Sequence, residues 1–229
     1  MEDKSVYVVL TSTASKFGKI VRVITHNEYN HLALATTDDL SDICAFARRK
    51  YKTPLNAGFV HEKLEYYTLN DRNSIRTKVY KIPVTKKQYN KLVSVLNEIE
   101  NDPEYMYNLF SAITYPFIGG FRTYKAYTCV EFVATVLDET GIVKVDKAHK
   151  ITPEEYGNII DKYEYYVGNL ENIMKKSESI DYDFFTKDSL RKYVWVNTKT
   201  VAKLSKRLGS KIKGKVLRYE VHGKQSKYC

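Results

Sequence analysis

The stretch Thr128-Cys129-Val130-Glu131 holds the strongest local signal in this 229-residue chain. A Thr and a Glu three residues apart form a capping box, in which each side chain accepts a hydrogen bond from the other residue's free backbone N–H at the start of a helix. Apolar residues then recur at helical spacing from Phe132 to Leu137, and Gly141 stands where a C-terminal cap is expected. The stretch therefore predicts a helix that begins at Cys129.

As the first helical residue, Cys129 has an environment that suits chemistry. The positive end of the helix macrodipole and the unpaired backbone N–H groups favour a thiolate over a thiol. A cysteine activated in this way, with a histidine brought to it by the fold, is the working pair of a nucleophilic hydrolase. The alternative is a cysteine that serves only as a small apolar core residue. The capping box argues against that alternative, because a cysteine that only fills the core gains nothing from lying at the first position of a helix.

Length and composition indicate one globular domain with an appendage, since 43% of the residues are hydrophobic. No run approaches the length of a membrane span, and the first ten residues, MEDKSVYVVL, lack a secretory pattern. The cysteines, Cys44, Cys129 and Cys229, show neither a disulfide framework nor metal-ligand spacing. We therefore expect a cytoplasmic protein with reduced thiols, no metal and no cofactor.

The net charge of +10 is concentrated at the C-terminal end. Residues 1–185 contain 24 Lys/Arg and 25 Asp/Glu, whereas residues 186–229 contain 13 and 2, so the two parts carry −1 and +11. This shift predicts a main domain over residues 1–185 and a basic extension over residues 186–229, packed on the same domain.

Within the basic extension, Val201, Leu204, Leu208 and Ile212 lie three to four residues apart among lysines. This pattern is typical of a basic amphipathic helix, which either lies on an anionic surface such as nucleic acid or a membrane, or packs its apolar stripe on the main domain. Packing on the domain is favoured because Trp195 and its neighbours are expected to be buried.

The remaining patterns predict an α+β fold. A helix should follow the Thr85–Gln88 capping box, another should begin at Thr152-Pro153-Glu154-Glu155, and residues 16–25 suggest a short helix. The second and third predicted strands should form a hairpin. The predicted strands are Val6–Leu10, His31–Ala35, Ile43–Ala47 and Val79–Val84.

Four stretches, residues 10–12, residues 24–35, Phe46–Lys50 and Tyr127–Val133, together resemble the circularly permuted NlpC/papain-like cysteine hydrolases, the YiiX-like amidases and peptidases among them. In the permuted members a histidine strand precedes the cysteine helix, and here His31 precedes Cys129 by 98 residues. The resemblance covers residues 5–160. It implies a papain-like fold with an antiparallel sheet packed on helices and the nucleophilic cysteine at a helix N-terminus.

The resemblance also implies roles for individual residues. Cys129 is the expected nucleophile and His31 its base, with the ring about 3–4 Å from the sulfur on a central strand. The backbone N–H of Cys129 is the expected oxyanion donor. His26 is the competing histidine, and its polar turn predicts a solvated loop residue.

Related enzymes orient the histidine with a polar side chain on the following strand, and that strand, residues 43–46, has no carboxylate or amide. Asp42 and Glu62 are the nearest candidates, and we prefer Glu62 as the orienting residue. The alternatives are a backbone carbonyl or a water in that role, with Glu62 an ordinary surface carboxylate.

The predicted function is a cysteine hydrolase or acyltransferase that acts on a peptide, amide or lipid-acyl substrate at an amide, thioester or ester carbonyl. The alternative is a non-catalytic binding module on the same scaffold, whose basic extension binds nucleic acid or an anionic membrane.

Overall fold

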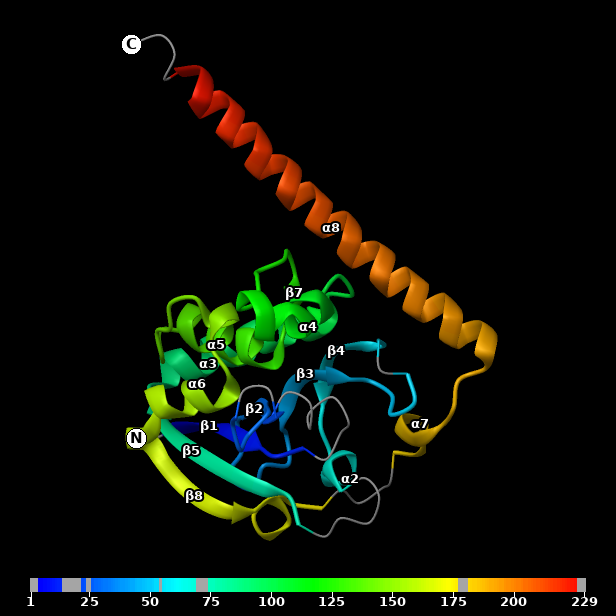
Figure 1. Ribbon diagram of the computed structural model, residues 1–229. Helices are drawn as coiled ribbons and strands as arrows, with labels where there is room; N and C mark the ends of the chain where they lie inside the picture. Colours follow the sequence, from blue (N-terminus) through cyan, green and yellow to red (C-terminus); the bar gives the residue numbers. More distant parts are fainter. Residues whose placement is uncertain are drawn as a thin grey trace.

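Six strands pair into one antiparallel sheet in the order β4-β3-β2-β1-β5-β8 (Figure 1). The computed structural model describes residues 4–13, 22–23, 26–53, 55–68, 74–176 and 181–225, with Pro116 and residues 211–225 described by their backbone alone. All four predicted strands and the hairpin are confirmed. The strands are β1 (Lys4–Thr11), β2 (His31–Ala35), β3 (Cys44–Arg48), β4 (Ala57–His61), β5 (Arg76–Val84) and β8 (Glu164–Asn169).

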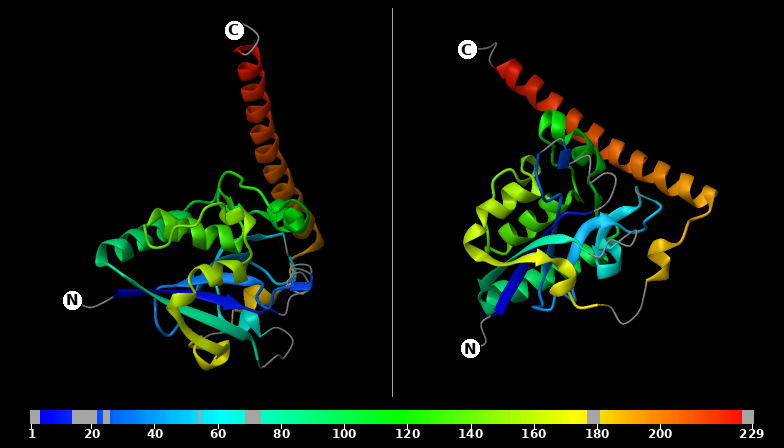
Figure 2. Two further views of the ribbon diagram at one scale, coloured as in Figure 1. Left: turned by 60° about the vertical axis from the view of Figure 1, so that its left-hand side comes forward. Right: turned by 60° about the horizontal axis from the view of Figure 1, so that its bottom comes forward.

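Both faces of this sheet are covered, so its central strands are buried on both sides. In β1, Val8 and Leu10 belong to one core cluster and Tyr7 and Val9 to the other, as the two-residue period of a strand requires. Helices α3 (Lys86–Asn101), α5 (Cys129–Glu139) and α6 (Pro153–Ile159) lie on the first face (Figure 1 and Figure 2). The second face is covered by α2 (Leu64–Tyr67) and by residues 170–174. The class is therefore α+β, as predicted.

The three helices on the first face all start at capping boxes, which confirms the predicted starts. In each box the Thr side chain accepts from the backbone of the third helical residue, whose side chain accepts from the Thr backbone; the pairs are Thr85 with Gln88, Thr128 with Glu131, and Thr152 with Glu155. Gly141 follows α5 with φ of 70°, in the left-handed region that glycine adopts without strain. The short helix predicted at residues 16–25 lies largely outside the described residues.

The remaining elements connect these layers. Strands β6 and β7 form a small parallel pair before α5. No helix in the described part of the chain is both long and apolar enough to cross a membrane. The elements are β6 (Met106–Tyr107), α4 (Leu109–Ile118), β7 (Ala126–Tyr127), η1 (Ala148–Lys150), η2 (Asp161–Tyr163), η3 (Leu170–Asn172), α7 (Tyr182–Phe185) and α8 (Leu190–Gln225).

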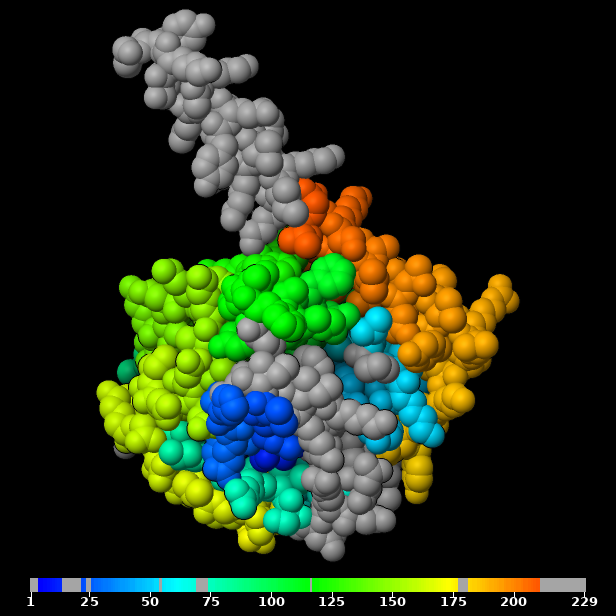
Figure 3. Space-filling view, viewed as in Figure 1, coloured from blue at the N-terminus to red at the C-terminus, as the bar shows by residue number. Residues whose placement is uncertain are grey.

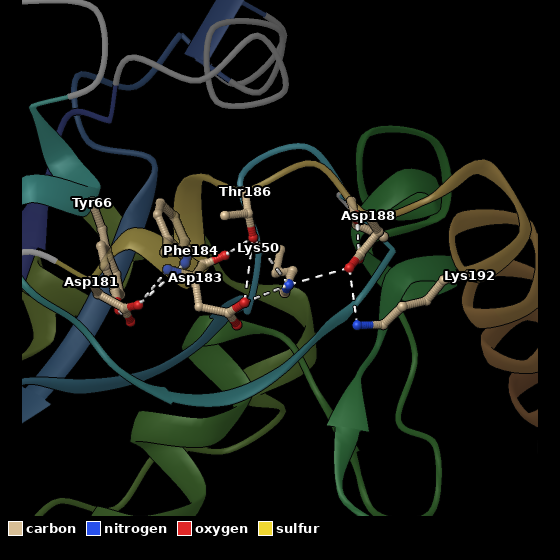
Figure 4. A network of polar contacts seen from close by, with 9 residues as sticks. Lys50, Tyr66, Asp181, Asp183, Phe184, Thr186, Asp188 and Lys192 are labelled. Atoms are coloured by element: carbon tan, nitrogen blue, oxygen red, sulfur yellow. Dashed lines mark hydrogen bonds and ion pairs between the residues drawn. The ribbon is translucent and has the colours of Figure 1, made fainter.

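The segment that leads into α8 is held against the main body by a buried lysine (Figure 4). Lys50 follows β3 and is 9% exposed, and its Nζ lies 2.8 Å from Asp183 Oδ1 and 3.2 Å from Asp188 Oδ1. Beside it, the rings of Tyr66 and Phe184 stack with their centroids 3.8 Å apart. A charge taken out of water is costly unless it is paired, so this network ties residues 181–188 to the sheet.

One expectation for α8 is wrong, because Trp195 is 61% exposed and Val194 is 53% exposed. The helix contacts the body through Leu204, which is 1% exposed. Trp195 precedes Leu204 by nine residues, which at 100° per residue places it on the opposite side of the helix. The buried aromatic residue of this region is Phe184 instead.

Candidate active site

The first residue of β2, His31, is a buried histidine paired with a buried carboxylate. Its Nε2 lies 2.9 Å from Glu62 Oε2 and 3.1 Å from Glu62 Oε1. Both residues are less than a tenth exposed. Because β2 lies in the interior of the sheet, the histidine has the central-strand position that the sequence predicted.

Glu62 reaches this position from the end of β4, two strands away from β2. Its backbone N–H donates to the Ile43 carbonyl at 2.8 Å, which fixes the chain where the strand ends. The buried Tyr67 hydroxyl donates to the same Glu62 carboxylate, and the Tyr67 ring centroid lies 6.1 Å from that of His31. The carboxylate is thus held by a hydrogen bond from Tyr67 and by the imidazole of His31.

Asp42, the other candidate for orienting the histidine, has a different role. Its carboxylate accepts hydrogen bonds from the backbone N–H groups of Thr36 and Thr37, at 3.0 to 3.1 Å, and from both threonine hydroxyls. This is the pattern by which an Asp side chain closes a turn between strands. Asp42 therefore holds the β2–β3 turn.

The fold brings Cys129 to the same histidine. Burial by itself disfavours the charged imidazole, but the negative charge of Glu62 and hydrogen bonding to the Cys129 and Glu62 side chains outweigh it and raise the pKa of His31 from 6.5 to about 10. Because Nε2 faces Glu62, we expect Nδ1 to be the nitrogen available to the sulfur. At neutral pH a protonated His31 thus lies between a carboxylate and the first residue of a capped helix.

The cap of α5 is itself anchored in the core. Glu131 is 2% exposed, and its Oε2 accepts from the Thr128 backbone N–H at 2.9 Å and from Asn108 Nδ2 at 3.4 Å. Burial raises the pKa of Glu131, while its hydrogen bonds oppose that shift. Asn108 in turn is the N-cap of α4. The start of the cysteine helix is therefore fixed by side chains from two helices.

Tyr107 of β6 feels the charge of Cys129. The pKa of Tyr107 is raised by burial and by the negative charges that Cys129 and Glu131 carry when ionised. The Tyr107 hydroxyl therefore stays protonated over the physiological range.

His26, His61 and Cys44 have other surroundings. His26 is exposed in a turn with φ of 56°, as predicted for a loop residue, and the exposed His61 pairs with Glu100 at 3.1 Å. Cys44 is buried, its thiol donates to the Leu34 carbonyl at 3.4 Å, and burial raises its pKa well above the ordinary value. Cys229 lies outside the described residues.

Sequence reasoning named Cys129, His31 and Glu62 but missed Tyr67, Tyr107 and Asn108. Asn108 had a readable signal, since an Asn directly before an apolar helix is a typical N-cap. The two tyrosines had none, because nothing local to a buried tyrosine shows which carboxylate or thiol the fold will bring to it.

No group of three or more His, Cys, Asp or Glu side chains among the described residues is arranged to hold a metal ion. Comparison with known protein families finds no family model that matches the chain. Comparison with curated proteins finds no match either. The functional argument therefore rests on the geometry of this site.

Proposed function

We propose that the protein is a cysteine hydrolase or acyltransferase with Cys129 as nucleophile, His31 as acid and base, and Glu62 as the residue that orients His31. The observation that carries this proposal is that the buried His31 interacts with the carboxylate of Glu62 and with Cys129, the first residue of a capped helix. A core cysteine needs neither partner. The substrate class is an acyl group in amide, thioester or ester linkage, as the permuted NlpC/papain-like resemblance implies.

The chemistry follows from this arrangement. The Cys129 thiolate attacks the acyl carbon, and the developing oxyanion is stabilised by the backbone N–H groups of Cys129 and Val130, which are unpaired in the first turn of any helix. His31 then gives its proton to the departing amine, alkoxide or thiolate, which leaves a thioester on Cys129. Water or another acceptor then attacks that thioester, and His31 takes the acceptor's proton. The acyl group passes to the acceptor, and the Cys129 thiolate is regenerated.

Glu62 supports both steps through its negative charge and by orienting the His31 ring. It stabilises the imidazolium that the first step requires, and it holds the ring so that Nδ1 faces the sulfur. A reduced thiol is needed throughout, so we place the activity in the reducing environment of the cytoplasm.

An activated acyl donor tests the proposal without knowledge of the natural substrate. A p-nitrophenyl ester should give a burst of nitrophenol, and intact mass should show one acyl group added at Cys129. Cys129→Ala should abolish the adduct, and His31→Ala should slow its formation by about a hundredfold or more. Cys44→Ala and His61→Ala serve as matched controls. An adduct that forms equally fast in His31→Ala would contradict the proposal.

A further inference from the structure

Helix α4 carries an apolar stripe that is covered at one end and bare at the other. Its sequence, LFSAITYPFI, contains no charged residue. Leu109, Ile113 and Phe117 follow one another at four-residue spacing and so share one face. At the start of this stripe, Leu109 and Phe110 pack against the cluster formed by Met106, Ala126 and Leu204 of α8. Beyond that contact the stripe is open to solvent.

The open end consists of Ile113, Phe117 and Ile118, which are 50%, 82% and 64% exposed and are called the α4 tip below. Three large apolar side chains at one helix end are unusual on a water-exposed surface and mark a place that binds something apolar. Elsewhere in the described chain, exposed apolar residues include Leu190, Val194 and Trp195 near the start of α8, which are 78%, 53% and 61% exposed.

The α4 tip is rigidly built. The chain reverses directly after Ile118 through Gly119 and Gly120, whose φ values are 70° and 67°. The Phe121 backbone N–H then donates to Ser111 Oγ at 3.0 Å, and a Cβ on Gly120 would lie 2.3 Å from the His149 carbonyl oxygen. The exposed side chains are therefore displayed on a fixed helix end.

Positive charge is concentrated on α8, the helix whose Leu204 is buried near the start of α4. Between Leu190 and Ser210, α8 contains no acidic residue, and Figure 3 shows this part of α8 (orange) to the right of and above the green region that contains α4, on the same face. Arg207 donates to the carbonyls of Tyr124 and Lys125 at 2.8 and 3.1 Å, and its guanidinium lies 5.7 Å from the centroid of the exposed Tyr124 ring.

The lysines of α8 add to this charge. Lys199 and Lys206 are exposed. Burial lowers the pKa of Lys203, and the neighbouring charges of Arg207 and Lys199 lower it further, as expected where positive charges are crowded.

We propose that the α4 tip and the basic face of α8 dock the protein on the surface of an anionic phospholipid bilayer. Apolar side chains on a helix end enter the boundary between headgroups and acyl chains, while flanking lysines and arginines contact anionic headgroups. A nucleic acid would use the charge but leave the apolar tip without a partner. A second copy of this chain would bring like charges together. This docking does not depend on Cys129.

Vesicle co-sedimentation of the full chain tests the proposal, with phosphatidylcholine vesicles that either contain or lack phosphatidylserine. We expect binding that requires phosphatidylserine and weakens with salt. The double variant Phe117→Ser, Ile118→Ser should bind at least about tenfold more weakly, because two large apolar side chains no longer leave water. Lys199→Glu with Lys206→Glu should lose the preference for phosphatidylserine.

Val167→Ser is the matched control, because Val167 is 57% exposed on β8, which lies on the side of the molecule opposite α8 in Figure 1. Thermal melts check that every variant is folded. Insertion is measured directly with Phe117→Trp in a Trp195→Phe background, where tryptophan emission should shift to the blue on vesicles and be quenched by doxyl-labelled lipid.

The proposal is overturned if the Phe117→Ser, Ile118→Ser variant binds vesicles as well as the wild type, or if the emission of the Phe117→Trp variant does not change. It is also overturned if single-stranded RNA displaces the protein from vesicles and binds equally well to that double variant. The ester-burst experiment on Cys129 reports separately on catalysis, so failure of one proposal is distinguishable from failure of the other.

Discussion

At the scale of single residues, the charge of His31 is the property on which the candidate site depends. A buried imidazole without a carboxylate would be neutral at pH 7, because desolvation disfavours its protonated form. Glu62 reverses this preference and raises the pKa of His31 to about 10. The same carboxylate therefore sets both the charge and the direction of the ring.

Glu62→Gln should separate charge from shape. The amide keeps the size of the side chain but removes the negative charge, so burial should return His31 to its neutral form near pH 7. We expect alkylation of Cys129 by iodoacetamide at neutral pH to slow by roughly tenfold to a hundredfold. Rates are measured per cysteine by peptide mass spectrometry. Asp42→Asn is the control, and equal slowing in that variant would exclude a specific role for Glu62.

Tyr67→Phe tests the hydroxyl that holds Glu62. Loss of a buried hydrogen bond to a carboxylate should lower the free energy of unfolding by about 1–3 kcal/mol and slow Cys129 alkylation several-fold. Tyr66→Phe is a matched control on the same helix, because the Tyr66 hydroxyl donates to Asp181 instead. Chemical denaturation and the alkylation rate are compared for both. Slowing in Tyr66→Phe alone would contradict this role for Tyr67.

His31 should also make stability depend on pH. A folded-state pKa raised from 6.5 to about 10 gives a stabilisation that is complete below about pH 6.5 and is lost as pH rises through 10. The difference in free energy of unfolding between wild type and His31→Gln should therefore shrink from pH 6.5 to pH 10, measured by urea denaturation. His61→Gln, on an exposed histidine, is the control. If this difference in free energy of unfolding grew with pH, the pKa of His31 would be lowered by folding and not raised.

At the scale of elements, the start of α5 has two tasks. Its capping box stabilises the helix as the boxes of α3 and α6 do, but only this box has a cysteine at the next position. The effect of the cap on stability can be separated from its effect on thiol reactivity by comparing variants of the capping boxes of α5 and α3.

Thr128→Ala and Thr85→Ala should both lower the free energy of unfolding by about 1 kcal/mol, since each removes one N-cap hydrogen bond. Only Thr128→Ala should also slow alkylation of Cys129, by several-fold, because the first turn that presents the thiol is loosened. Denaturation and alkylation are measured on both variants. If Thr85→Ala slows alkylation equally, the effect is a global loss of stability.

At the scale of the whole molecule, the first part of the basic extension is bound to the main body. Up to Ser210 it carries the Lys50–Asp188 pair, the buried Leu204 and the carbonyl contacts of Arg207. A boundary at residue 185, drawn from charge alone, passes through this contact network.

Two truncations test the division. Removal of residues 186–229 should lower the melting temperature, because Lys50 loses Asp188 and the cluster of Met106 and Ala126 loses Leu204. Removal of residues 211–229 should leave the melting temperature and Cys129 alkylation close to those of the full chain. Equal melting temperatures for both truncated proteins would show that the contacts of residues 186–210 contribute nothing to stability.

The sequence by itself determined four of the strands, the capped starts of α3, α5 and α6, and the choice of Cys129 and His31 as candidates. Capping boxes, strand alternation and Gly141 act over a few residues, so their signals are readable without the fold. Glu62 could be named only as a candidate, since its reach to His31 crosses β3 and depends on the sheet order.

Only the tertiary structure decided the rest. Tyr67 is tied to Glu62 because α2 packs under the sheet, and Asp42 is removed from the site because it closes its own turn. Only the fold likewise decided that Leu204 is buried and Trp195 exposed. The periodicity of α8 predicts an apolar stripe but does not show which part of the protein covers it. Local interactions follow from local sequence, whereas the partner of a buried charge or stripe is fixed by the packing of the whole chain.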